Sequence, residues 1–243
     1  MDHKNEIRAL EIRTAINDLI NDIDILYINV FYTGLEMVEK RYLIDETPTA
    51  NLQTEVIETS YTSRLISKIN ILFENAQNNP YGLDCAGPEK KGLYSSGDDK
   101  NAIIKHPDIV IHKGSNPQTG QQEIICEIKR ITNLGASEMI YDLNKLINYT
   151  DSENWGKPYR IAIFLVYNCN IKQLKEKVER YRNVTCKIEK LNFNSEFVQQ
   201  MSFSEFVTVH QERLRNILCF CHVDEKVVEV CTMFDIMGSQ LIN

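Results

Sequence analysis

The feature that most constrains the fold is a run of residues, 159–167, that is apolar on both of its alternating faces. Its sequence is Tyr159-Arg160-Ile161-Ala162-Ile163-Phe164-Leu165-Val166-Tyr167. Successive side chains of a strand point to opposite faces of its sheet. A strand with one solvent-exposed face would therefore show a polar residue at every second position. The run therefore predicts a strand in the middle of a sheet that is covered on both sides.

Helical and strand-like segments alternate along the rest of the chain. Apolar residues at three- and four-residue spacing predict helices over residues 4–40, 52–75, 136–149, 171–182 and 204–215. Further strands are predicted over residues 83–86, 106–112, 123–130, 184–191, 217–222 and 227–234. This order favours an α/β fold with a mixed central sheet flanked by helices. We divide the chain into an N-terminal helical extension (1–46), a core (47–170) and C-terminal α/β elements that complete the same domain (171–243).

Length and composition exclude some classes of protein. The 243 residues contain no apolar run near the roughly 20 needed to span a bilayer, and the polar start is not a signal peptide, so no membrane partner is expected. Seven scattered cysteines, an odd number, suit buried free thiols in the cytoplasm better than a disulfide framework. The net charge of −7 argues against a high-affinity DNA-reading protein but not against a nuclease with a local basic patch.

A predicted hairpin over residues 106–130 carries the residues best suited to catalysis or metal binding. Its two arms are joined by residues 113–121, which are rich in turn formers. If His112 lies opposite Glu123, antiparallel register places Asp108 opposite Glu127 on one face, which Lys129 shares. The other face of the hairpin is wholly apolar. Two carboxylates and an ammonium group therefore converge, and this predicts a metal site with a catalytic lysine.

The same residues resemble a known signature. Pro107-Asp108, a spacer of 18 residues and Glu127-Ile128-Lys129 resemble the motif of the PD-(D/E)XK, or restriction-endonuclease-like, nuclease superfamily. Upstream, Glu58 stands six residues before Arg64-Leu65, which resembles the first helix of small bacterial members. Downstream, Asp142-Leu143-Asn144-Lys145-Leu146 resembles their second helix. The resemblance covers about residues 50–167.

The resemblance implies a restriction-endonuclease-like core and a set of site residues. Asp108 and Glu127 would be metal ligands, Glu58 an accessory ligand and Lys129 the catalytic lysine. Ile128, between the two motif residues, is counted with the metal ligands. The expected metal is Mg²⁺ or Mn²⁺. Glu55, one helical turn before Glu58, competes for the role of the helix carboxylate.

Three basic residues are candidates for substrate binding, and two of them have a structural alternative. Lys145 is expected either to meet a phosphate or to form an ion pair within its own helix. Arg64 is expected to contact a substrate phosphate or to form a structural salt bridge, and the salt bridge is favoured. Arg130 extends a modest basic cluster that begins at Lys129.

The predicted function is metal-dependent hydrolysis of phosphodiester bonds in DNA or RNA. Mg²⁺ held by carboxylates activates water and stabilises developing charge, and an adjacent lysine can orient the attacking water. We expect a cytoplasmic, bacterial-type defence or repair protein that works as a homodimer or with a partner protein. The alternative is a catalytically inactive nuclease-fold protein that acts as a nucleic-acid-binding or protein-interaction module.

Overall fold

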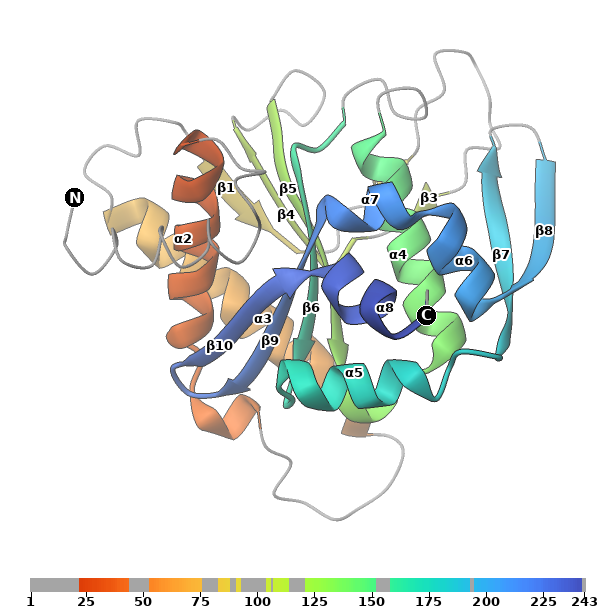
Figure 1. Cartoon of the computed structure of the whole chain (residues 1–243). Helices are drawn as coiled ribbons and strands as arrows, with labels where there is room; N and C mark the ends of the chain where they lie inside the picture. Colours follow the sequence, from red (N-terminus) through yellow and green to blue (C-terminus); the bar gives the residue numbers. More distant parts are fainter. Residues whose placement is uncertain are drawn as a thin grey trace.

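The chain folds into a mixed six-stranded sheet with helices on both faces, which confirms the predicted α/β class (Figure 1). The structure is a computed structural model, and it describes residues 22–43, 53–75, 83–87, 91–92, 104–105, 107–113, 121–151, 158–192 and 195–241.

The central sheet combines parallel and antiparallel neighbours. Its strands, in spatial order, are β1 (Leu83–Ala86), β4 (Ile109–Lys113), β5 (Gln121–Arg130), β6 (Ile161–Tyr167), β9 (Ile217–Asp224) and β10 (Val227–Thr232). The middle strands β5, β6 and β9 run parallel, and the outer pairs are antiparallel. Two separate strand pairs are β2 (Lys91–Gly92) with β3 (Ile104–Lys105), and β7 (Thr185–Asn192) with β8 (Ser195–Ser202).

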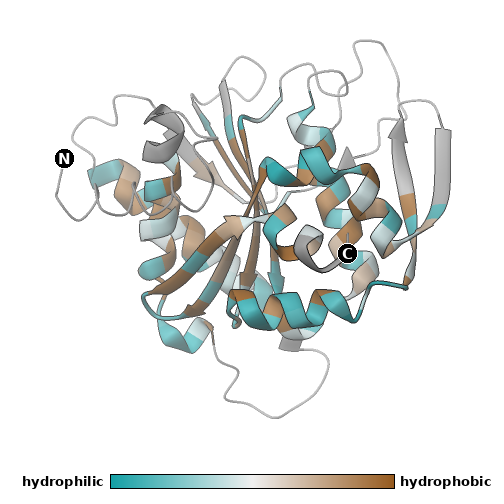
Figure 2. Ribbon diagram, in the orientation of Figure 1, coloured by the Kyte–Doolittle hydropathy of each residue, from teal (hydrophilic) through white to brown (hydrophobic). Residues whose placement is uncertain are grey.

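Strand β6 occupies the middle of the sheet, as its apolar run predicted. All seven of its residues are buried. Ile163 packs into the core on one face, and Phe164 packs into the core on the other. Figure 2 shows the hydrophobic centre of the sheet between helices whose outer surfaces are hydrophilic. Truncating Phe164 to Ala would cost about 3–5 kcal/mol of stability, as is usual for a fully buried aromatic side chain.

One face of the sheet is covered by helices α2 (Asp22–Glu36) and α3 (Gln53–Asn75). The short 3₁₀ helix η1 (Lys40–Tyr42) follows α2. Ile28, Phe31 and Leu35 of α2 are fully buried against the sheet. The hydroxyl of Tyr32 also donates a hydrogen bond to the carbonyl of Val228 in β10, at 3.1 Å. The part of the predicted 4–40 helix that precedes residue 22 lies outside the described residues.

A polar contact within this core joins α3 to the sheet. The hydroxyl of Tyr61 hydrogen-bonds Nδ1 of His222 in β9 at 2.8 Å. The Tyr61 ring also stacks on Tyr167 at the end of β6, with 4.2 Å between centroids. His222 is fully buried, and burial lowers its pKa to about 4. This histidine is therefore neutral in the folded protein at pH 7.

The opposite face is covered by α4 (Ala136–Thr150), α5 (Ile171–Glu179), α6 (Phe203–Val209), α7 (Gln211–Arg215) and α8 (Met233–Leu241), with the 3₁₀ turn η2 (Ile131–Asn133) after β5. The predicted helix over 204–215 is divided at His210. The predicted strand over 227–234 ends at Thr232, because Thr232 and Asp235 hydrogen-bond each other's backbone and start α8. Strand β8 and helix α8 were not predicted.

The cysteines behave as the composition suggested. All seven are free and buried. Among the described residues, no helix combines the length and the apolar character that crossing a bilayer requires.

Candidate functional site

The β4–β5 hairpin brings Asp108 next to the carboxyl end of β5. Val110 pairs with Ile125, as the predicted register requires, and Asp108 immediately precedes β4. The backbone N–H of Ile128 donates a hydrogen bond to Oδ2 of Asp108 at 2.7 Å. Ile125 packs in the core beneath α4, so Glu127 and Lys129 point to the α4 side of the sheet.

The far end of the hairpin differs from the prediction. A β-bulge between Ile111 and His112 shifts the register, so that His112 lies opposite Gln122 and not Glu123. The bulge lies beyond the Val110–Ile125 pair, and for this reason the site end of the hairpin is unaffected. His106, the predicted start of the first arm, lies outside the described residues.

Helices on opposite faces of the sheet complete the cluster. From α3, Oε1 of Glu58 lies 3.5 Å from Nζ of Lys129. From α4, Oδ2 of Asp142 lies 3.3 Å from the same ammonium group. Lys145, one turn further along α4, places Nζ 2.9 Å from Oδ1 of Asp142 and 2.7 Å from Oε2 of Glu127. We call Glu58, Asp108, Glu127, Lys129, Asp142 and Lys145 the β5 cluster.

Burial shapes the electrostatics of the β5 cluster. Burial raises the pKa of Glu127 well above its usual range, and the charges of Asp142 and Asp108 raise it further, against the effect of Lys145. Burial also raises the pKa of Asp108 and of Glu58. Burial removes the water that would stabilise these carboxylates when charged, and the nearby hydrogen bonds and lysines do not fully replace that stabilisation.

The two lysines stay charged in this setting. Burial alone disfavours the charged form of Lys129, but Asp142, Glu58 and the other carboxylates outweigh it and raise its pKa. The pKa of Lys145 is raised in the same way, chiefly by Glu127 and Asp142. Both side chains therefore act as fixed cations at neutral pH.

The β5 cluster is short of positive charge. It holds four carboxylates, Glu58, Asp108, Glu127 and Asp142, against two ammonium groups, so two negative charges remain when all six groups are ionised. Oε1 of Glu127 is buried and has no hydrogen-bond partner among the described residues. A divalent cation would balance the charge and satisfy this oxygen, so the donor set fits Mg²⁺ or Mn²⁺ in charge and in chemistry.

The geometry of the side chains is less favourable to a metal. Among the described residues, no three acid, histidine or cysteine side chains are arranged as a ligand set for one ion. The reason is visible in the ion pairs: Lys145 lies against Glu127, and Lys129 lies against Glu58 and Asp142. The side chain of Ile128 packs in the core under α2 and α3, so only its backbone faces the cluster.

Of the other predicted site residues, Glu58 joins the cluster, whereas the three basic candidates are paired or buried. Glu55 lies in the first turn of α3, where the side chains are not described. Arg64 donates from Nε to Oε2 of Glu39 at 2.7 Å, which is the structural salt bridge that the sequence favoured. Lys145 and Arg130 are only 6% and 8% exposed, which limits their access to a large substrate.

The sequence placed Asp142 in the second-helix motif beside Lys145 but gave it no specific contact. Its i,i+3 spacing to Lys145 places both side chains on one face of α4, and they form the within-helix ion pair that was the structural alternative for Lys145. That face is buried at both positions, with 2% and 6% exposure. Buried charges on a helix face that meets a sheet need partners on that sheet.

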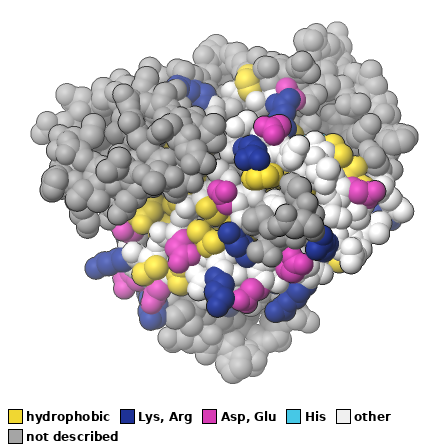
Figure 3. Space-filling model, in the orientation of Figure 1, with side chains coloured by type: hydrophobic (Ala, Val, Ile, Leu, Met, Phe, Trp, Pro, Cys, Tyr) yellow, Lys and Arg dark blue, Asp and Glu magenta, His cyan; other side chains and the backbone are white. Residues whose placement is uncertain are grey.

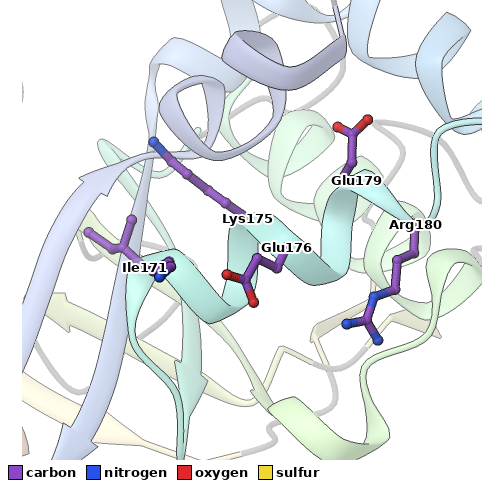
Figure 4. Close-up of a pocket in the computed structure, with 6 residues that line it drawn as sticks. Ile171, Lys175, Glu176, Glu179 and Arg180 are labelled. Atoms are coloured by element: carbon purple, nitrogen blue, oxygen red, sulfur yellow. The ribbon is translucent and has the colours of Figure 1, made fainter.

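The molecular surface offers weaker candidates than the β5 cluster. On the face shown in Figure 3, basic and acidic side chains are interspersed and do not form a single-sign area. A hollow of about 670 Å³ lies against α5, lined by Ile171, Lys172, Lys175, Glu176, Glu179 and Arg180 (Figure 4). These residues come from one helix and its end, carry charges of both signs and include no member of the cluster.

Comparisons with known proteins add no relative: no protein-family model, no curated protein and no solved structure matches the chain. The geometry and chemistry of the β5 cluster are therefore the best guide to the function of this chain.

Proposed function

We propose that this chain is a metal-dependent nuclease with a restriction-endonuclease-like core of the PD-(D/E)XK type. The observation that carries the proposal is the β5 cluster itself, with its four carboxylates and two lysines, which carry two excess negative charges when all six groups are ionised. Asp108 precedes β4, Glu127 and Lys129 lie on β5 and Glu58 lies on α3, and ordinary surface charges do not converge in this way.

In this proposal Asp108 and Glu127 hold Mg²⁺ or Mn²⁺, and Glu58 assists. When bound, the metal supplies Lewis acidity to a phosphodiester and lowers the pKa of bound water. Asp108 is fixed for this role by the hydrogen bond from Ile128, which orients one of its oxygens. Glu127 is fixed by burial and by Lys145.

Lys129 is the better placed of the two lysines to meet substrate. Its side chain is 20% exposed, against 7% for Lys145 and 1% for Glu127. An ammonium group at this position can donate hydrogen bonds to an attacking water or to the non-bridging oxygens of the phosphate, where charge develops. The substrate is nucleic acid, with DNA favoured over RNA, and the setting is the cytoplasm, where seven free thiols stay reduced. A homodimer or a partner protein would place two such sites on a duplex.

A second candidate is a nuclease-fold protein without turnover that binds nucleic acid or another protein. The observation that favours it is the filling of the space between the carboxylates by the two lysines. Against it stands Glu58, which is directed at Lys129 and not turned away.

Cleavage assays separate the two candidates. Supercoiled plasmid, single-stranded DNA and RNA are incubated with the wild-type protein and with Lys129→Ala, each with Mg²⁺, Mn²⁺ or EDTA. The nuclease proposal expects cleavage that needs the metal and falls strongly in the variant. Binding without metal-dependent cleavage of any substrate supports the second candidate, and equal cleavage by both proteins means that this site is not responsible.

A further inference from the structure

Asp142 lies between the two lysines of the β5 cluster and gives one oxygen to each. Its Oδ2 is 3.3 Å from Nζ of Lys129, and its Oδ1 is 2.9 Å from Nζ of Lys145. Its side chain is only 3% exposed. The carboxylate therefore links a lysine of the sheet to a lysine of its own helix.

Each lysine has a second carboxylate on its other side. Lys129 reaches Glu58 of α3 at 3.5 Å, and Lys145 reaches Glu127 of β5 at 2.7 Å. The charges therefore alternate along one path, in the order Glu58, Lys129, Asp142, Lys145, Glu127. Asp142 is at the centre of this path, and its removal would free both ammonium groups from their shared anchor.

We propose that Asp142 is a positioning residue that holds Lys129 at the outer end of the site while it keeps Lys145 on Glu127. This inference rests on the proposed nuclease function and assigns a different role to each lysine. Lys145 compensates the buried carboxylate, and Lys129 is presented to the phosphate. A lysine has a flexible four-carbon stem, so an ammonium group without this anchor would spend most of its time away from the reacting position.

A purely structural role for Asp142 makes a different prediction. Carboxylates outnumber ammonium groups by four to two in the cluster, so replacing Asp142 by the isosteric, neutral Asn reduces repulsion among buried charges. Each lysine also keeps its other carboxylate. The positioning role therefore expects a folded variant with slow catalysis, whereas a structural role expects a loss of stability.

The test compares wild type, Asp142→Asn, Lys129→Ala and the double variant in metal-dependent cleavage, with thermal unfolding of each protein. We expect Asp142→Asn to lower kcat by about 10- to 100-fold, the usual effect of removing a residue that orients a catalytic group, with little change in KM. In the Lys129→Ala background the same substitution should change kcat by less than about threefold, because the group that Asp142 presents to the phosphate is gone and Lys145 is still held by Glu127. Glu176→Gln, an exposed site on α5, is the matched control and should cleave like wild type.

The outcomes are distinguishable. Cleavage by Asp142→Asn at the wild-type rate, or an equal loss in both backgrounds, overturns the positioning role and leaves the nuclease proposal standing. A wild-type protein that cleaves no substrate with any metal overturns both. If Asp142→Asn unfolds below the assay temperature, the double variant Asp142→Asn/Lys145→Met replaces it, because it removes one charge of each sign. Its kcat must then be about 10- to 100-fold below that of Lys145→Met alone.

Discussion

Lys145 of α4 and Glu127 of β5 form the shortest of the four ion pairs in the β5 cluster, with 2.7 Å between Nζ and Oε2. The sequence assigned Glu127 to metal binding and left Lys145 between phosphate binding and an ion pair within its own helix. Their contact shows that the lysine compensates the carboxylate, since both are almost fully buried. Breaking such a pair by removing one partner leaves an uncompensated buried charge.

Lys129→Ala tests the proposed catalytic lysine. We expect kcat to fall by about 10²–10³, the range found when a transition-state hydrogen-bond donor is removed. Metal binding should persist, because the carboxylates of Asp108 and Glu127 remain. Calorimetric titration with Mn²⁺ alongside the cleavage assay checks both statements. A variant that cleaves normally would show that Lys129 is only a salt-bridge residue.

Asp108→Asn tests the metal ligand. The amide oxygen of Asn can still accept the hydrogen bond from Ile128, so the hairpin should keep its structure. The lost charge should abolish Mn²⁺ binding and nearly all cleavage. Circular dichroism of the variant should match that of the wild type, which separates loss of the site from loss of the fold. Normal Mn²⁺ affinity in this variant would remove Asp108 from the ligand set.

Mg²⁺ should stabilise the folded protein. A ligand that binds only the folded state at about 100 times its Kd adds about 2.7 kcal/mol to the free energy of unfolding. The thermal midpoint should therefore rise with Mg²⁺ and return to its starting value with EDTA, and NaCl at matched ionic strength is the control. Glu127→Gln should remove the response, because it deletes a buried charge that the cation balances. A midpoint indifferent to Mg²⁺ in the wild type would argue for the inactive alternative.

His222 should make stability fall in acid. Burial lowers its pKa to about 4, from 6.5 in an unfolded chain. Between these values the unfolded chain binds a proton that the folded chain does not, so stability that is complete above pH ~6.5 is lost as the pH falls to 4, by about 3 kcal/mol. Urea unfolding at pH 7 and pH 4.5 should show a smaller difference for His222→Asn than for the wild type. The buried carboxylates titrate in both proteins and cancel in this comparison.

The elements that carry the site were predictable because their signals are local. The two-sided apolar run gave β6. The assumed antiparallel register placed Val110 opposite Ile125, with Asp108 and Glu127 at the same end of the hairpin, although its starting pair, His112 with Glu123, was wrong. The periodicity over 52–75 gave α3 with Glu58 on it. Each of these inferences uses spacing within a single element or across one hairpin, where the geometry of the chain leaves few choices.

The parts that were missed depend on contacts between distant elements. Spacing cannot show that Asp142 and Lys145 meet the carboxyl end of β5, because this follows from how α4 packs on the sheet. The bulge beside His112 changes the register by one residue and has no clear sequence marker. The capping hydrogen bonds of Thr232 and Asp235 end a strand that would otherwise continue, and the apolar residues that follow it belong to α8.

Helix α2 precedes every residue of the β5 cluster in the sequence, yet its side chains Ile28, Phe31 and Leu35 form part of the core on one face of the sheet. A shortened protein that began at residue 47 would keep α3 but expose to water the apolar surface that α2 covers, and it would be prone to aggregate. The smallest fragment able to display the site therefore has to keep this helix. In that sense α2 is part of the fold that carries the site and not a detachable accessory.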